Sequence, residues 1–250
     1  MNWKKLKEAF FKYWVLPWGA CYFMVLPAYA DDNIISLEQS GDNLNLNIVQ
    51  VGFNNKIRML DGSSYINNAP NLSLHIEQYN LRDGDLNQVV IDEMSGSGNS
   101  LRIGQGVSLD DASDTTFYYD GWETGGHYFE IDLYGNNNNI AGYQINNNNG
   151  NSGHEINIHI AGSSNDLWYV QKQDGSKTIN LDVYNSDNDI SIIQRGNSDT
   201  HTATIELDGN FGTDFYLLQD GLNPNGGRTY TIEQFCNNPA GCSVSVTQNN

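Results

Sequence analysis

Apolar and polar residues alternate along short stretches of the chain, and many of these stretches end in glutamine. Residues 188–197 read NDISIIQRGN, where Ile190 and Ile192 lie on one face and Gln194 takes the next position of that face. Such alternation is typical of a strand with one buried face. Clusters of Asn, Asp, Ser and Gly separate the stretches, as turns separate strands. No stretch shows a sustained helical period, so the pattern predicts an all-β chain.

The pattern apolar-x-apolar-x-Gln occurs repeatedly, with glutamines 23 to 39 residues apart. Only one repeat has a non-apolar middle residue, Gly142. Repetition at this period indicates a repeat architecture. The motif glutamines are Gln50, Gln78, Gln105, Gln144, Gln171, Gln194, Gln219 and Gln248.

Most repeats contain an earlier alternating segment, as at 129–133, 156–160 and 179–183. A turn cluster follows each of these segments, so a unit consists of two strands. One such unit cannot bury its apolar face alone, whereas stacked units form a continuous core. We therefore expect a β-solenoid (β-helix) of about eight two-stranded coils over 31–250. In such a column each inward amide donates to one neighbour and accepts from the other, which satisfies the amides and sets the register.

The first 30 residues differ from the rest. Four lysines precede an apolar run over 13–26, and the segment ends in Ala28-Tyr29-Ala30. These features predict a secretory signal peptide over 1–30. A membrane anchor is the alternative, but Pro17 interrupts the run, which falls short of the about 20 apolar residues of a helical span.

The remaining chain, 31–250, is strongly acidic. Removing four lysines and one glutamate leaves 8 basic and 29 acidic residues, a net charge of −21. This charge repels phosphate backbones and anionic membrane surfaces. We expect a secreted or cell-surface protein with no nucleic-acid partner and no membrane insertion of the mature chain.

Two cysteines of this region, Cys236 and Cys242, flank the turn-forming stretch NNPAG. An oxidising compartment would allow them to form a disulfide that closes a short bend. Two free thiols are the alternative.

The sequence offers little for catalysis. The histidines lack metal-ligand spacing, and His75 and His159 occupy outward strand positions. Residues 185–189 and Asp110, Asp111 and Asp114 could bind calcium, but the tandem glycine-rich nonapeptide of calcium-binding β-rolls is missing. We expect no metal, no other cofactor and no enzyme activity; a polysaccharide-active β-helix enzyme is the remaining catalytic option.

One segment departs most from the repeat pattern, an insertion at 107–127. It contains Phe117, Tyr118, Tyr119 and Trp122 among acidic residues and glycines. These aromatics could form an exposed patch for a carbohydrate, a partner subunit or the secretion apparatus. Alternatively, the segment folds its aromatics back over one end of a sheet.

The first unit contains a second, more specific motif. It is Gln39-x-Gly41-x-Asn43, followed eleven residues after Gln39 by Gln50-x-Gly52-x-Asn54. This pattern resembles the curlin repeat of curli, the secreted functional amyloid of bacterial biofilms. Elsewhere the first strand usually ends in Leu, Val or Ile where curlin has its second glutamine.

The resemblance implies a structural subunit that leaves the cell through an outer-membrane pore. It would polymerise outside the cell with copies of itself or with a second curlin-type subunit, into amyloid-type fibres of a biofilm matrix that serve adhesion. We see no helical or proline-rich cap beside the first strand, 34–39, or the last, 243–248, and exposed strand edges pair readily with another chain. The alternative is a monomeric β-helical adhesin or surface carbohydrate-binding protein.

Overall fold

The computed structural model describes residues 33–35, 45–59, 66–67, 73–80, 86–107, 126–145, 154–172, 177–196, 200–221 and 227–248. No helix occurs among them, so the all-β prediction is confirmed. The predicted signal peptide lies outside these residues. Within them, no helix has the length and apolarity needed to cross a membrane.

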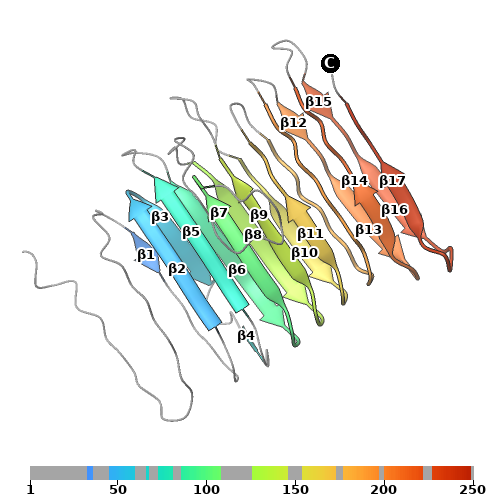
Figure 1. The fold of residues 1–250 in the computed structure, drawn as a ribbon, viewed down its shortest axis with the longest axis horizontal. Coiled ribbons are helices and arrows are strands. Elements are labelled where there is room, and N and C mark those ends of the chain that lie inside the picture. The colour runs from blue at the N-terminus through green and yellow to red at the C-terminus, as the bar shows by residue number, and fades with distance from the viewer. Residues whose placement is uncertain are drawn as a thin grey trace, which may run out of the picture.

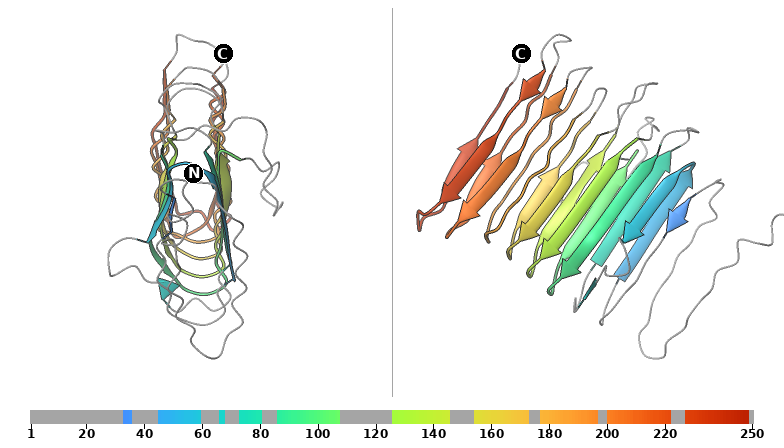
Figure 2. Two further views of the ribbon diagram at one scale, coloured as in Figure 1. Left: turned by 90° about the vertical axis from the view of Figure 1, so that its left-hand side faces the viewer. Right: turned by 180° about the vertical axis from the view of Figure 1, so that it is seen from behind.

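The strands stack side by side in two facing layers (Figures 1 and 2). The first sheet has the order β1-β3-β6-β8-β10, and β4 also pairs with β6. Its strands are β1 (Ile34–Ile35), β3 (Asn55–Met59), β4 (Ile66–Asn67), β6 (Asn87–Ser95), β8 (Tyr128–Tyr134) and β10 (Asn157–Ala161). The second sheet has the order β11-β9-β7-β5-β2. Its strands are β2 (Asn45–Gly52), β5 (Ser73–Asn80), β7 (Ser100–Gln105), β9 (Asn139–Gln144) and β11 (Asp166–Tyr169).

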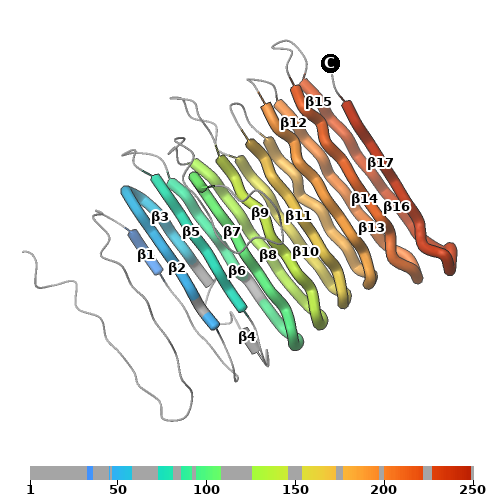
Figure 3. Tube along the Cα trace, viewed as in Figure 1, coloured from blue at the N-terminus to red at the C-terminus, as the bar shows by residue number. Residues whose placement is uncertain are grey.

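The C-terminal part continues the two layers with three parallel strand pairs, β12-β15, β13-β16 and β14-β17. Their strands are β12 (His201–Thr202), β13 (Ile205–Gly209), β14 (Thr213–Tyr216), β15 (Arg228–Thr229), β16 (Ile232–Cys236) and β17 (Cys242–Ser245). The tube in Figure 3 shows the chain passing back and forth between the layers along one axis. Every strand pair among the described residues is parallel. The predicted β-solenoid is therefore present, with about five turns of regular parallel stacking.

The core lies between the two layers and follows the predicted alternation. In β8 the side chains of Phe129, Ile131 and Leu133 are fully buried, while the residues between them are half-buried. The same inward positions are filled by Ile158 and Ile160 in β10. One continuous apolar cluster results, because equivalent positions of successive coils lie over one another.

The prediction of regular strands over 179–183 and 190–194 is wrong. Residues 177–196 contain only isolated bridges, such as Asp166 with Asp189. Asn180 and Leu181 have φ of 79° and 73°, and Gln194 has φ of 36°, far from the extended backbone of a strand. The side chains nevertheless point inward as expected, and Leu181 is only 2% exposed. The alternation thus gives the buried face correctly even where the backbone departs from a strand.

Candidate functional site: stacked amides and strand edges

The motif glutamines form a file of amides at the end of the second-sheet strands. The register of neighbouring strands pairs Gln50 with Gln78, Gln78 with Gln105 and Gln105 with Gln144. Six of the motif glutamines are fully buried, and Gln50 and Gln248 at the two ends of the file are half-buried. A buried amide needs hydrogen-bond partners to avoid a large desolvation cost.

Most of these amides bond directly to one another. The Nε2–Oε1 distances are 2.8 Å for Gln50 to Gln78, 2.8 Å for Gln78 to Gln105 and 3.0 Å for Gln105 to Gln144. In the C-terminal half the distances are 2.8 Å for Gln194 to Gln171, 2.6 Å for Gln219 to Gln194 and 2.9 Å for Gln248 to Gln219.

The second amide hydrogen reaches across the core to the opposite layer. Gln78 donates to the carbonyl oxygen of Lys56 at 3.1 Å, and Gln105 donates to that of Gln88 at 3.0 Å. Gln194 donates to Thr178 O at 2.7 Å. Each of these three amides therefore connects its own coil both to the next coil along the axis and to the facing layer of the solenoid.

The direction of donation reverses in the middle of the file. Gln144 accepts from Gln105, and Gln171 accepts from Gln194, so both residues use their oxygens away from the middle of the file. No hydrogen bond joins these two described residues. Gln144 instead donates to the carbonyls of Tyr128 and His154, both at 2.9 Å, and Gln171 donates to that of Glu155 at 2.8 Å.

A second file of amides occupies the tight turns, and sequence reasoning missed it. Its side chains are at most 2% exposed, and the Oδ1 of each of the first three members accepts from both the backbone and the side-chain nitrogen of the following asparagine at 2.7–3.2 Å. Every member precedes a motif glutamine by six residues, which is the signal that would have found it. The members are Asn99, Asn138, Asn165 and Asn188, and the backbone of Thr213 continues the file with a 2.7 Å bond to Asn188.

A third file, also missed, consists of buried polar and basic side chains at the start of the segments that form the first layer. The rings of His127 and His154 lie 5.0 Å apart, and His201 is in register with Lys177 and with Arg228. Each member stands two residues before the first apolar residue of its strand, on the same inward face. The file runs Asn55, Asn87, His127, His154, Lys177, His201 and Arg228, and none is more than 6% exposed.

The two expected surface histidines remain on the outside. His75 Nε2 lies 3.1 Å from Glu77 Oε1, and His159 Nδ1 lies 3.8 Å from Asp132 Oδ2. Within the described part of the chain, no group of three or more His, Cys, Asp or Glu side chains is placed to hold a metal ion. Of the residues considered for calcium, Asp187 and Asp189 are exposed and Asn188 belongs to the turn file.

The remaining motif residues are only partly described. Gly52 ends β2 and Asn54 lies in the turn after it, with φ of 91° and 51°. Gln39, Gly41 and Asn43 lie outside the described residues, as do Asp110, Asp111 and Asp114 and the insertion aromatics Phe117, Tyr118, Tyr119 and Trp122.

Cys236 and Cys242 form a disulfide with a Cα–Cα distance of 5.8 Å at the turn between β16 and β17.

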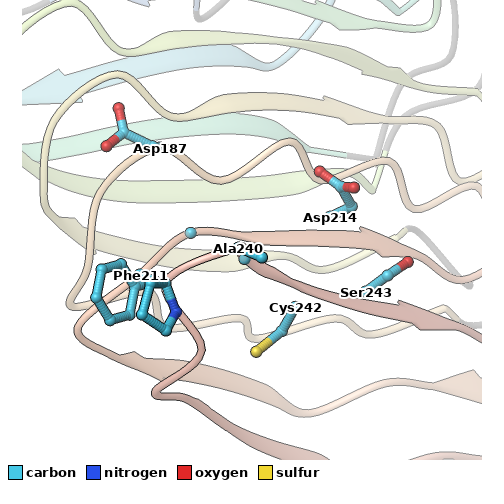
Figure 4. Close-up of a pocket in the computed structure, with 9 residues that line it drawn as sticks. Asp187, Phe211, Asp214, Ala240, Cys242 and Ser243 are labelled. Carbon is cyan, nitrogen blue, oxygen red and sulfur yellow. The ribbon is translucent and has the colours of Figure 1, made fainter.

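A shallow pocket lies beside this turn, and Figure 4 shows Asp187, Phe211 and Asp214 around it. Its lining residues include these two carboxylates but no histidine, lysine or arginine. They do not form the nucleophile–base pair that covalent catalysis uses.

A row of carboxylates crosses the outer face of the second sheet. Asp189 is in register with Asp166 on one side and with Asp214 on the other. Burial raises the pKa of the Asp166 carboxyl, and the neighbouring Asp189 raises that pKa further. Protonation of Asp166 therefore favours the fold, and this contribution is lost as pH rises through the folded-state pKa.

Asp189→Asn is expected to stabilise the chain at neutral pH, because it removes a negative charge that lies in register with Asp166 and Asp214 of the adjacent coils. The gain should be near the low end of about 0.2–1 kcal/mol, since these side chains are partly screened by solvent. Urea unfolding measures it, and the gain should shrink as pH falls through the raised pKa of Asp166, because protonation removes the repelling charge. Asp220→Asn is the matched control, because Asp220 lies 3.8 Å from Arg195 and should lose rather than gain stability. An Asp189→Asn variant less stable than the wild type would contradict the repulsion.

The strand edges at the two ends of the column are the remaining feature of interest. Ile34 and Ile35 of β1 are 46% and 53% exposed. Beyond β17, which pairs with β14, no further strand lies among the described residues. Phe235 of the neighbouring β16 is 60% exposed. Such edges carry backbone N–H and C=O groups that a further strand could pair with.

Comparison with protein-family models, with curated proteins and with solved structures finds no match to this chain.

Proposed function

We propose that this chain is a secreted, curlin-like structural subunit that assembles into extracellular amyloid-type fibres by adding copies at its strand edges. The observation that carries the proposal is the glutamine file, which ends in a half-buried amide at each end of the column. Gln50 and Gln248 each donate to one motif glutamine, so each leaves its Oε1 acceptor for a neighbouring copy. A second copy stacked at either end would extend the backbone ladders and meet this acceptor.

Three further elements belong to the proposal. The chain has eight coils, one for each motif glutamine, and 1–30 directs it to export. The partners are other copies or a second curlin-type subunit, with an outer-membrane pore for secretion. The amides act as structural links and not as catalysts, because a neutral amide neither donates nor accepts a proton readily near neutral pH.

The open edge of β17 offers a direct test. The N–H groups of Cys242 and Val246 donate to the carbonyls of Gly212 and Tyr216. Since N–H groups alternate in direction along a strand, that of Ser245 points away from β14 to the open edge. Ser245→Pro removes this donor and leaves the bonds to β14 in place, because proline is tolerated on an edge strand.

We expect residues 31–250 to form thioflavin-positive filaments, visible by electron microscopy, with a growth lag that preformed seeds shorten. Ser245→Pro should slow seeded growth by about tenfold or more, the equivalent of about 1.4 kcal/mol per junction. Ser245→Ala, which keeps the N–H, should grow like the wild type. A chain that stays monomeric at high concentration would contradict assembly. Equal growth of the two variants would contradict the role of this edge.

A further inference from the structure

Three aromatic rings form a row on the outer face of the first sheet. Tyr134 ends β8, His159 lies in β10, and Tyr184 belongs to the following coil. The ring centroids of Tyr134 and His159 are 5.7 Å apart, and those of His159 and Tyr184 are 5.4 Å apart. Tyr184 is 49% exposed and the His159 side chain 36% exposed. The row is therefore open to solvent although its residues come from three successive coils.

Tyr184 lies in the irregular coil over 177–196, where positive φ values recur. Its own φ is 40°, beside 79° at Asn180 and 73° at Leu181. Val183, the residue before it, is fully buried, so the chain turns Tyr184 outward directly beside the core.

Carboxylates surround the row. Asp132 Oδ2 lies 3.8 Å from His159 Nδ1, and the Tyr184 hydroxyl donates to Asp182 Oδ2 at 3.4 Å. The pKa of the Tyr184 phenol is raised, chiefly by Asp182 and more weakly by Glu206 and Asp208. Every charged group that acts on this tyrosine is thus an acid, and the exposed rings lie in a field that attracts cations.

We propose that this aromatic–acidic row, made of Tyr134, His159, Tyr184, Asp132 and Asp182, binds a polysaccharide of amino sugars. The C–H face of a pyranose ring can pack on a tyrosine ring, and an ammonium group is attracted both to the face of an aromatic ring and to a carboxylate. Tyr134 and Tyr184 are two strand spacings apart, about 10 Å, which is close to the length of a disaccharide unit in an extended chain. This inference does not depend on fibre formation.

The test uses the full chain at mildly acidic pH, at which the amino groups of the sugar carry a proton, and a fluorescently labelled glucosamine hexamer, with binding followed by anisotropy. We expect binding that weakens about tenfold in Tyr184→Ala, in line with loss of a ring contact and a cation–π contact. Asp182→Asn keeps the side-chain shape and should weaken binding by a similar factor. Tyr216→Ala makes the same change on the outer face of the second sheet, where the proposal places no site, and should bind like the wild type.

Two further probes test whether binding needs both the sugar rings and their ammonium groups. The N-acetylated hexamer lacks the ammonium groups and should bind about tenfold less tightly or worse. Pentalysine carries charge without sugar rings and should bind weakly. Pentalysine binding as tight as that of the glucosamine hexamer would overturn the proposal in favour of a basic peptide. Absence of hexamer binding, or equal losses in Tyr184→Ala and Tyr216→Ala, would also overturn it.

Discussion

Gln194→Leu is expected to lower the free energy of unfolding by about 3 kcal/mol or more, because it leaves several buried polar atoms without partners at about 1–3 kcal/mol each. Gln194 is fully buried. It donates to Gln171 Oε1 at 2.8 Å and to Thr178 O at 2.7 Å, and it accepts from Gln219 Nε2 at 2.6 Å. Leucine has a similar size, so the loss comes from unpaired polar atoms and not from a cavity.

Urea unfolding measures the stability of this variant, and the rate of seeded growth measures its effect on register. Gln173→Leu is the control, because Gln173 follows the motif glutamine Gln171 by two residues and is expected to lie beyond the strand. Gln88→Leu is a second control, since the Gln88 side chain is half-buried on the outer face and its contact with the file is made by its backbone carbonyl. If all three substitutions slow seeding equally, Gln194 has no special role in register.

The layers and the core could be predicted because a strand alternates with a period of two. Once glutamine is counted with the apolar face, positions such as Ile190, Ile192 and Gln194 identify the inward side directly. The repeat in the sequence predicted that the coils stack, because a two-stranded unit cannot bury its own apolar face. Backbone geometry does not follow from alternation, which is why the irregular coil over 177–196 was not foreseen.

The turn file of asparagines was missed for a different reason. Asn99, Asn138 and Asn165 stand in runs of Asn, Ser and Gly, where turn propensity already explains an asparagine. Only the constant interval of six residues to the motif glutamine distinguishes them from their neighbours. Lys177 and Arg228 were missed because cations are normally exposed, and their inward position becomes visible only when the alternation is extended two residues upstream of the apolar segment.

Gly142 is the exception in the glutamine motif, and the structure gives its reason. It is in register with Tyr169 of the next coil, at an inward position that branched or long side chains fill elsewhere. The Tyr169 ring is fully buried and stacks on Phe129, with centroids 5.8 Å apart. A Cβ on Gly142 would lie 2.3 Å from Tyr169 Cδ1 and 2.5 Å from its carbonyl oxygen. The small residue in one coil therefore makes room for the large one in the next.

Gly142→Ala is accordingly expected to destabilise the fold by about 1–3 kcal/mol through overpacking. In a Tyr169→Leu background the same change should cost less but not nothing, because the ring contact is gone while the carbonyl contact remains. The coupling between the two sites, obtained from urea unfolding of the four variants, should reach about 1 kcal/mol. Gly196→Ala is the matched control, since its nearest neighbour would be Gly221 O at 3.9 Å and the change should be close to neutral. Equal costs of Gly142→Ala in both backgrounds would show that the backbone alone, and not the size of Tyr169, requires glycine at this position.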